Sequence, residues 1–168
     1  MSLTILGVDP GSRITGFGVI RIEQGKVVHI NHGVILLDVD SGFPNRMTEL
    51  GQSFREVVGK YKPDHVVIEK IFLGKNADSA FKLGHARGVI MYEAGLGGAR
   101  VEEYATRLVK KGITGNGGST KEEVQVMLQA MLGLKTISRI DASDALAMAC
   151  FHAFELKKRS VLEKAVSI

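Results

Sequence analysis

The stretch that decides the fold is residues 3–22, which read LTILGVDPGSRITGFGVIRI. Its first part, Leu3–Asp9, is an apolar run that predicts a buried strand. Asp9 ends this run and opens a Pro-Gly turn, after which Gly16–Ile22 predicts a second strand. An acidic residue at the end of a buried strand is costly to place unless a positive group binds it. Asp9 is therefore the first candidate for a functional residue.

The rest of the chain mixes strand and helix patterns with the turn signals that separate them. A hairpin turn is predicted at residues 23–26, and Ser119 followed by Glu122 fits a capping box. The order of elements predicts one α/β domain over residues 1–158, with a mixed five-stranded sheet, helices on both faces and a frayed tail over 159–168. The further predicted strands are Val27–Leu37, His65–Glu69 and Arg100–Tyr104, and the predicted helices are Pro44–Lys60, Asn76–Leu96, Thr106–Lys111, Thr120–Leu132 and Asp141–Leu156.

Composition sets limits on the class of protein. The 168 residues are enough for one sizeable core, and the net charge of +4 favours an anionic partner. A single cysteine, Cys150, excludes an internal disulfide or a cysteine-based zinc site, and its apolar surroundings predict a buried, inert thiol. No signal segment or run of about 20 apolar residues is found, so we expect a soluble, cytoplasmic protein without a membrane partner.

Three further carboxylates are predicted to gather near Asp9. Glu69 ends a second apolar run, and Asp141 and Asp144 stand three residues apart at the start of the last helix. Taken singly, each acid also suits a turn, an exposed strand end or the first turn of a helix. The two helical aspartates, however, lie on or beside the face of the helix that packs on the sheet. Acids that only cap a helix in solvent would not need this orientation. Four acids together predict a pocket whose like charges repel until a cation neutralises them.

Clusters of oxygen ligands suit hard divalent cations such as Mg²⁺. Two metals about 4 Å apart would activate a water and stabilise the leaving oxygen, so the predicted chemistry is metal-assisted attack on a phosphodiester. No histidine has metal-ligand spacing to another, and each is predicted to be a surface or packing residue. These are His29, His32, His65, His85 and His152.

Four segments, in the right order and covering nearly the whole chain except the tail, resemble the RuvC family of bacterial Holliday-junction resolvases. They are Gly7–Gly18, Ile68–Phe72, Lys75–Ala80 and Asp141–Ala147. The resemblance implies a ribonuclease H-like fold and a homodimer that nicks two opposed strands of a four-way DNA junction. It also implies the RuvA–RuvB branch-migration complex as a partner.

By position, the resemblance assigns catalytic metal ligation to Asp9, Glu69, Asp141 and Asp144. It implies two Mg²⁺ ions per subunit, for which Mn²⁺ substitutes. Some members of the family have histidine where Asp141 stands, and this chain has the all-carboxylate version.

Four residues are candidates for DNA contact. Phe72 either packs in the core or, as the resemblance favours, stacks on an unpaired base, and Lys75 lies in the same loop. Lys110 and Lys121 match basic positions that the family uses. Lysines alone usually mark a solvated surface, but beside a phosphate-cutting site they position the backbone and offset charge in the transition state.

Two rival functions and one assembly question remain at this point. An ATPase of the actin or sugar-kinase kind shares the Asp-x-Gly hairpin but needs a second domain, and a non-catalytic junction-binding protein gains nothing from acids beside phosphates. The small-residue face of the segment Asn76–Leu96 predicts a dimer contact, although small residues also suit packing of a helix on a sheet. Its members are Ala77, Ala80, Gly84 and Gly88.

Overall fold

The structure is a computed structural model that describes residues 2–70 and 77–166. Its five strands form one mixed sheet in the order β3-β2-β1-β4-β5. The pairs β1–β2 and β2–β3 are antiparallel, whereas β1–β4 and β4–β5 are parallel. The predicted mixed five-stranded sheet is confirmed. The strands are β1 (Leu3–Asp9), β2 (Ile14–Glu23), β3 (Lys26–Leu36), β4 (His65–Glu69) and β5 (Arg100–Tyr104).

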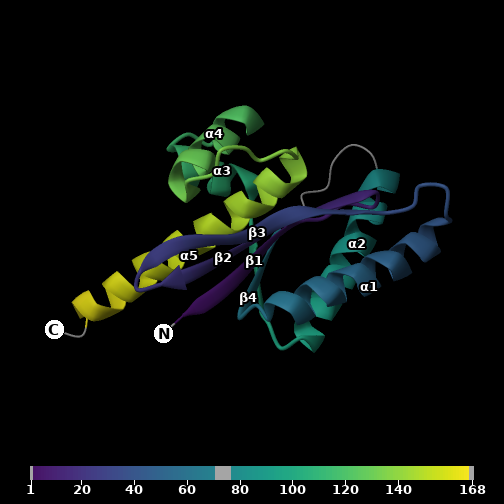
Figure 1. Cartoon of the computed structure of the whole chain (residues 1–168), viewed down its shortest axis with the longest axis horizontal. Coiled ribbons are helices and arrows are strands. Elements are labelled where there is room, and N and C mark those ends of the chain that lie inside the picture. Colours follow the sequence, from purple (N-terminus) through teal and green to yellow (C-terminus); the bar gives the residue numbers. More distant parts are fainter. Residues whose placement is uncertain (1, 71–76, 167–168) are drawn as a thin grey trace.

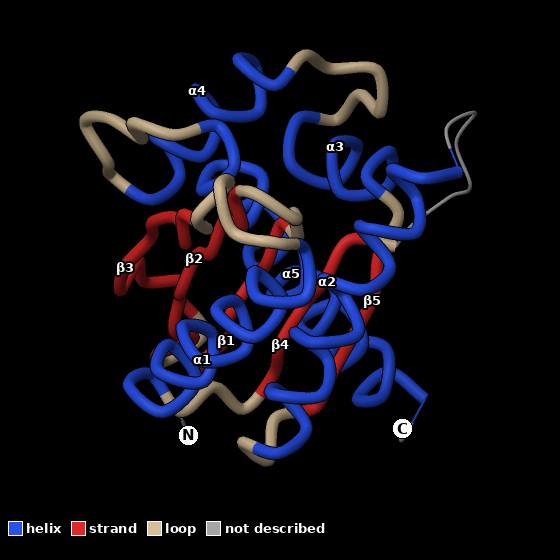
Figure 2. Tube along the Cα trace, turned by 90° about the vertical axis from the view of Figure 1, so that its right-hand side faces the viewer, coloured by secondary structure: helices blue, strands red, loops and turns tan. Residues whose placement is uncertain are grey.

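Helices cover both faces of this sheet, as the sequence predicts. Figure 1 shows α1 (Phe43–Tyr61) and α2 (Ala77–Leu96) on one side of the strands. On the other side lie α3 (Thr106–Thr114), α4 (Lys121–Leu132) and the long α5 (Ile140–Val166), and the turned view of Figure 2 shows the same layers. No helix of the described residues is long and apolar enough to cross a membrane.

Alternation along the central strands gives each face its own core. In β1, Ile5 belongs to the core under α5, whereas Leu6 and Val8 belong to the core under α1 and α2. Because successive side chains of a strand point to opposite faces, one apolar run supplies both cores. Fully buried Leu146 fills the first core and fully buried Phe54 fills the second.

A strip of glycines lets α5 lie directly on the sheet. Gly7 of β1 is paired with Gly18 of β2, and Asp9 is paired with Gly16. A Cβ atom at Gly7 or Gly16 would overlap main-chain atoms of α5 at Ala145 or Asp141, and one at Gly18 would overlap Leu146. Only residues without a side chain allow so close a contact, which fixes the first turn of α5 beside the end of β1.

The structure corrects two details of the prediction. First, the last helix was predicted to end at Leu156, whereas α5 continues through Val166. No glycine or proline interrupts residues 157–166, which are mostly good helix formers. Second, the capping box lies one residue later than predicted, because Thr120 accepts from the Glu123 N–H and the Glu123 carboxylate accepts from the Thr120 N–H.

A chain of three buried or half-buried rings ties β4 and β5 to α5. His65 Nδ1 lies 2.7 Å from His152 Nε2, and His152 Nδ1 lies 2.8 Å from the Tyr104 hydroxyl. His152 is fully buried, and burial, together with the nearby His65, lowers its pKa to about 4. These histidines are packing residues, as predicted.

We expect His152 to make the protein less stable as the pH falls from about 6.5 to about 4. The unfolded chain takes up the proton near the ordinary pKa of 6.5, whereas folded His152 resists it until about 4. The unfolded state therefore binds more protons in this window, and stability falls by up to about 3 kcal/mol. The measurement is urea unfolding of the wild type and of His152→Gln across this range. The free energy of unfolding of the wild type should exceed that of the variant by less and less towards low pH. A difference that does not change with pH would contradict the lowered pKa of His152.

Candidate active site

Two of the four predicted acids stand at the same edge of the sheet. Asp9 is the last residue of β1, and Glu69 is the last residue of β4. Because β1 and β4 are parallel neighbours with Val8 beside Ile68, both acids emerge at the carboxyl ends of adjacent strands. This is the edge at which open α/β sheets place their functional groups.

The other two acids arrive on the first turn of α5. The main chain of α5 at Asp141 lies over Gly16, which is the residue paired with Asp9. Helical spacing then puts Asp144 one turn further along on the same side. The contact between α5 and the glycine strip thus brings acids from opposite ends of the sequence together.

A small pocket of about 120 Å³ lies between these acids and helices α3 and α4. Asp9, Glu69 and Asp144 line it together with Lys110 and Lys121. Asp141 is not among its lining residues. Thr106, Val109, Val124, Ala147 and Met148 complete the lining.

Like charges in this pocket perturb Asp9 strongly. Its pKa is raised to about 7, first by burial and then by the negative charges of Asp144 and Glu69, with a smaller effect from Asp141. The charge of Lys121 opposes this shift. The other three predicted acids therefore all act electrostatically on Asp9, although Asp141 does not line the cavity.

Two groups hold neighbouring carboxylates in place. Lys121 Nζ donates a hydrogen bond of 2.5 Å to Asp144 Oδ2, and this bond raises the pKa of Lys121. Thr106 Oγ1 donates to Glu69 Oε1. Lys110 Nζ donates to the Ser119 carbonyl oxygen at 2.7 Å, so this lysine is held at the loop between α3 and α4.

The pocket suits a hard cation by its chemistry, although its carboxylates are not drawn together. Among the described residues, no three His, Cys, Asp or Glu side chains converge closely enough to hold a metal ion. Lys121 engages the carboxylate of Asp144, and Thr106 engages one oxygen of the Glu69 carboxylate. The donors are all oxygens, and a divalent cation would relieve the repulsion that raises the pKa of Asp9.

The structure adds one residue that the sequence analysis missed and leaves two untested. Phe72 and Lys75 lie outside the described residues. Thr106 was missed because a lone threonine at a helix start usually signals only a cap. The contact follows from the register of the sheet, since Thr106 follows Tyr104 by two residues and Tyr104 is the β5 partner of Glu69.

Comparison with known proteins agrees with this geometry. The family model for crossover junction endodeoxyribonuclease RuvC matches residues 5–152. A protein of that name from Bdellovibrio bacteriovorus is 76% identical over 168 residues, which is 100% of both chains. Another from Geotalea uraniireducens is 43% identical over 151 residues, covering 90% of this chain and 88% of the relative.

Solved structures give the same result. Thermus thermophilus RuvC in complex with Holliday junction substrate has a TM-score of 0.86 at 29% identity and covers 93% of this chain and 96% of that chain. The structure of Thermus thermophilus RuvC alone has a TM-score of 0.84 with the same coverage. The ribonuclease H-like fold expected from the resemblance is therefore confirmed. The chain belongs to the RuvC family of crossover junction endodeoxyribonucleases.

Proposed function

We propose that the chain is an endonuclease that resolves four-way DNA junctions by paired, symmetric nicks during recombination and repair. The observation that carries this proposal is the pocket in which acids from β1, β4 and α5 face lysines from α3 and α4. Its support comes from membership of the RuvC family and from the likeness to Thermus thermophilus RuvC with a Holliday junction substrate.

The acids of the pocket are proposed to hold the catalytic metal. Asp9, Glu69, Asp141 and Asp144 offer the oxygen ligands, and the resemblance implies two Mg²⁺ ions, with Mn²⁺ as a substitute. When bound, such ions activate a water and offset the charge on the leaving oxygen of a phosphodiester. Before that, Asp9 has to give up any proton that burial and its neighbours help it to keep.

The lysines are proposed to bind the scissile phosphate. Lys121 already neutralises Asp144, so a cation that takes over Asp144 would free the Lys121 ammonium for phosphate. Lys110 lines the same pocket and adds a second positive charge where charge develops in the transition state. Phe72 as a stacking platform and Lys75 as a phosphate contact stay predictions.

The rival functions fit less well. The family match covers the chain from residue 5 to residue 152, which leaves little of this chain for the second domain that an actin-like ATPase needs to enclose its nucleotide. A purely binding protein would not gather acids that repel DNA phosphates. The RuvA–RuvB partnership and a cytoplasmic location, both expected from the sequence, stay predictions.

A dimer through α2 is proposed because, within residues 2–70 and 77–166, no atom packs on the glycines of its small-residue face. Added Cβ atoms at Gly84 and Gly88 would meet nothing within 4 Å, and α2 instead packs inward through other residues. Those residues are Ala86, Ile90, Glu93 and Ala94. The face is therefore not used for packing on the sheet, which was the alternative reading of its small residues.

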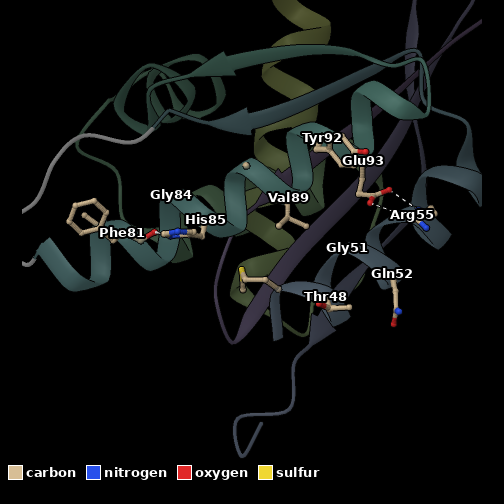
Figure 3. A pocket seen from close by; sticks show the side chains of 13 residues that line it. Thr48, Gly51, Gln52, Arg55, Phe81, Gly84, His85, Val89, Tyr92 and Glu93 are labelled. Atoms are coloured by element: carbon tan, nitrogen blue, oxygen red, sulfur yellow. Dashed lines mark hydrogen bonds and ion pairs between the residues drawn. The ribbon is translucent and has the colours of Figure 1, made fainter. Parts of the chain in front are cut away.

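An open groove of about 850 Å³ runs along this face between α1 and α2, as Figure 3 shows. Phe81 at one end and Tyr92 at the other are 69% and 64% exposed, which is unusual for aromatic side chains without a partner. Towards the Tyr92 end, Arg55 of α1 donates two hydrogen bonds to the buried carboxylate of Glu93 on α2, at 2.7 and 2.8 Å. The proposed occupant of the groove is a second copy of the chain. In a two-fold dimer, Phe81 and Tyr92 of each copy would face Gly84 and Gly88 of the other.

Removal of one acid should separate cutting from binding. Asp9→Asn or Glu69→Gln is expected to abolish cleavage of a synthetic four-way junction in Mg²⁺, while binding in the absence of metal stays equal or becomes tighter because one repulsive charge is gone. Gel-shift and cleavage assays on the same preparations measure both. The matched control is Glu56→Gln on the exposed surface of α1, which should cut normally. Near-normal cutting by either site variant would refute the ligand assignment.

Asp9→Asn should also stabilise the metal-free protein at neutral and higher pH. The folded pKa of about 7 exceeds the ordinary value of 3.8, so the native state holds a proton that the unfolded state loses. The resulting penalty grows as the pH rises from about 4 to about 7 and reaches about 2–4 kcal/mol. Thermal unfolding in EDTA at pH 8 should give the variant a higher Tm, with little difference at pH 4. Added Mg²⁺ should raise the Tm of the wild type only. If the variant were less stable than the wild type at pH 8, ionised Asp9 would not be destabilising in the folded protein.

The dimer proposal is tested by charge on the glycine face. Gly88→Glu should convert the protein to a monomer, because a bulky charge would face its own copy across the two-fold axis. Gly59→Glu is the matched control, since Gly59 lies on α1 and an added Cβ there also meets nothing within 4 Å. Sedimentation gives the mass, and a junction carrying two labels shows whether both opposed strands are nicked. Paired nicking by a monomeric Gly88→Glu protein would contradict the proposal.

A further inference from the structure

The hydroxyl of Thr106 contacts one of the acids proposed to bind metal. Thr106 Oγ1 donates a hydrogen bond to Glu69 Oε1, and both residues line the pocket. Nothing in the family assignment gives this threonine a role. The contact joins two elements, because Glu69 ends β4 whereas Thr106 begins α3.

The sheet explains why the two residues meet. Glu69 is in register with Tyr104 on β5, and the Lys70 N–H donates to the Tyr104 carbonyl oxygen at 2.8 Å. The pairing of β4 and β5 therefore continues to the very end of the strands. The helix α3 begins directly after Ala105, which brings the Thr106 hydroxyl within hydrogen-bonding reach of the Glu69 carboxylate.

Capping does not account for this threonine. The N-cap residue of α3 is Ala105, which makes no side-chain cap, and its carbonyl accepts from the N–H groups of Leu108 and Val109. Thr106 is the first residue within the helix, and its hydroxyl donates to Glu69. Its side chain is exposed, so it contributes little to the core.

The contact has a consequence for ligand geometry. A carboxylate with one oxygen engaged by a fixed hydroxyl has lost rotational freedom and offers its other oxygen in one direction. The same helix carries Lys110 one turn later, on the same side of the pocket. Thr106 thus sets Glu69 in a fixed relation to a group proposed to bind phosphate.

We propose that Thr106 is a positioning residue, which orients Glu69 for the divalent cation of the pocket. The inference rests on the metal site of the proposed function, and it concerns metal affinity rather than DNA affinity. Partners of this kind, which hold a ligand without touching the metal, typically change metal affinity or activity 10–100-fold when removed.

The test uses three threonine variants and Mn²⁺ as the probe. Thr106→Val removes the hydroxyl at constant shape, Thr106→Ser keeps it, and Thr136→Val is a matched control at an exposed loop threonine. Binding of Mn²⁺ to the protein alone, followed by electron paramagnetic resonance, should be about tenfold or more weaker for Thr106→Val. The serine variant and the control should bind as the wild type does.

Activity provides a second readout. In single-turnover cleavage of a four-way junction, Thr106→Val should need about tenfold more Mg²⁺ for half-maximal rate, while junction binding in EDTA stays unchanged and shows that the variant is folded. Wild-type Mn²⁺ affinity in Thr106→Val, or a loss in Thr106→Ser as large as that in Thr106→Val, would overturn the inference and leave the proposed function intact. If the Glu69→Gln variant binds Mn²⁺ as tightly as the wild type does, the metal site itself would be overturned.

Discussion

The contact between α5 and the glycine strip of the sheet is the constraint on which the rest of the structure depends. At Gly7, Gly16 and Gly18 the helix main chain lies where side chains would otherwise stand. This contact sets the height of α5 above β1 and β2, and hence the position of Asp141 and Asp144 relative to Asp9. It also explains why one helix can serve both as a core element and as a carrier of active-site groups. A methyl group in the strip would lift the helix and move half of the site with it.

The pocket shows how several acids are held close together in a folded protein while no cation is bound. Its acids come from three elements of the fold. Asp144 is held by Lys121 and Glu69 by Thr106, whereas the raised pKa of Asp9 favours its neutral form. The Lys121–Asp144 contact is polar and exchangeable, so a divalent ion would replace it without rearrangement of the core, whereas the Thr106 contact engages only one of the two Glu69 oxygens. Close like charges lower the stability of the folded protein, which is common at functional sites.

Most of the fold could be predicted from the sequence because its signals are local. The apolar run of β1 and the helical patterns of α1 and α2 predicted these elements to within a few residues of their bounds. The end of α5 was misjudged because charged residues do not end a helix unless a breaker follows them. In the site, the four acids were predicted from their places at the ends of elements. The Thr106–Glu69 contact could not be, because it depends on the register of β4 against β5, which no local pattern reveals.

The burial of His152 has a consequence for the number of protons that the protein carries. Between about pH 4 and pH 6.5 the folded chain holds one proton fewer than the unfolded chain at His152 and about one proton more at Asp9. These two departures have opposite signs, so Asp9 offsets the contribution of His152 to proton uptake on unfolding. The lowered pKa values of His29, His32 and His65 add to the contribution of His152. Binding of a cation at Asp9 would remove the offset, so the metal-bound protein should be the more acid-sensitive form.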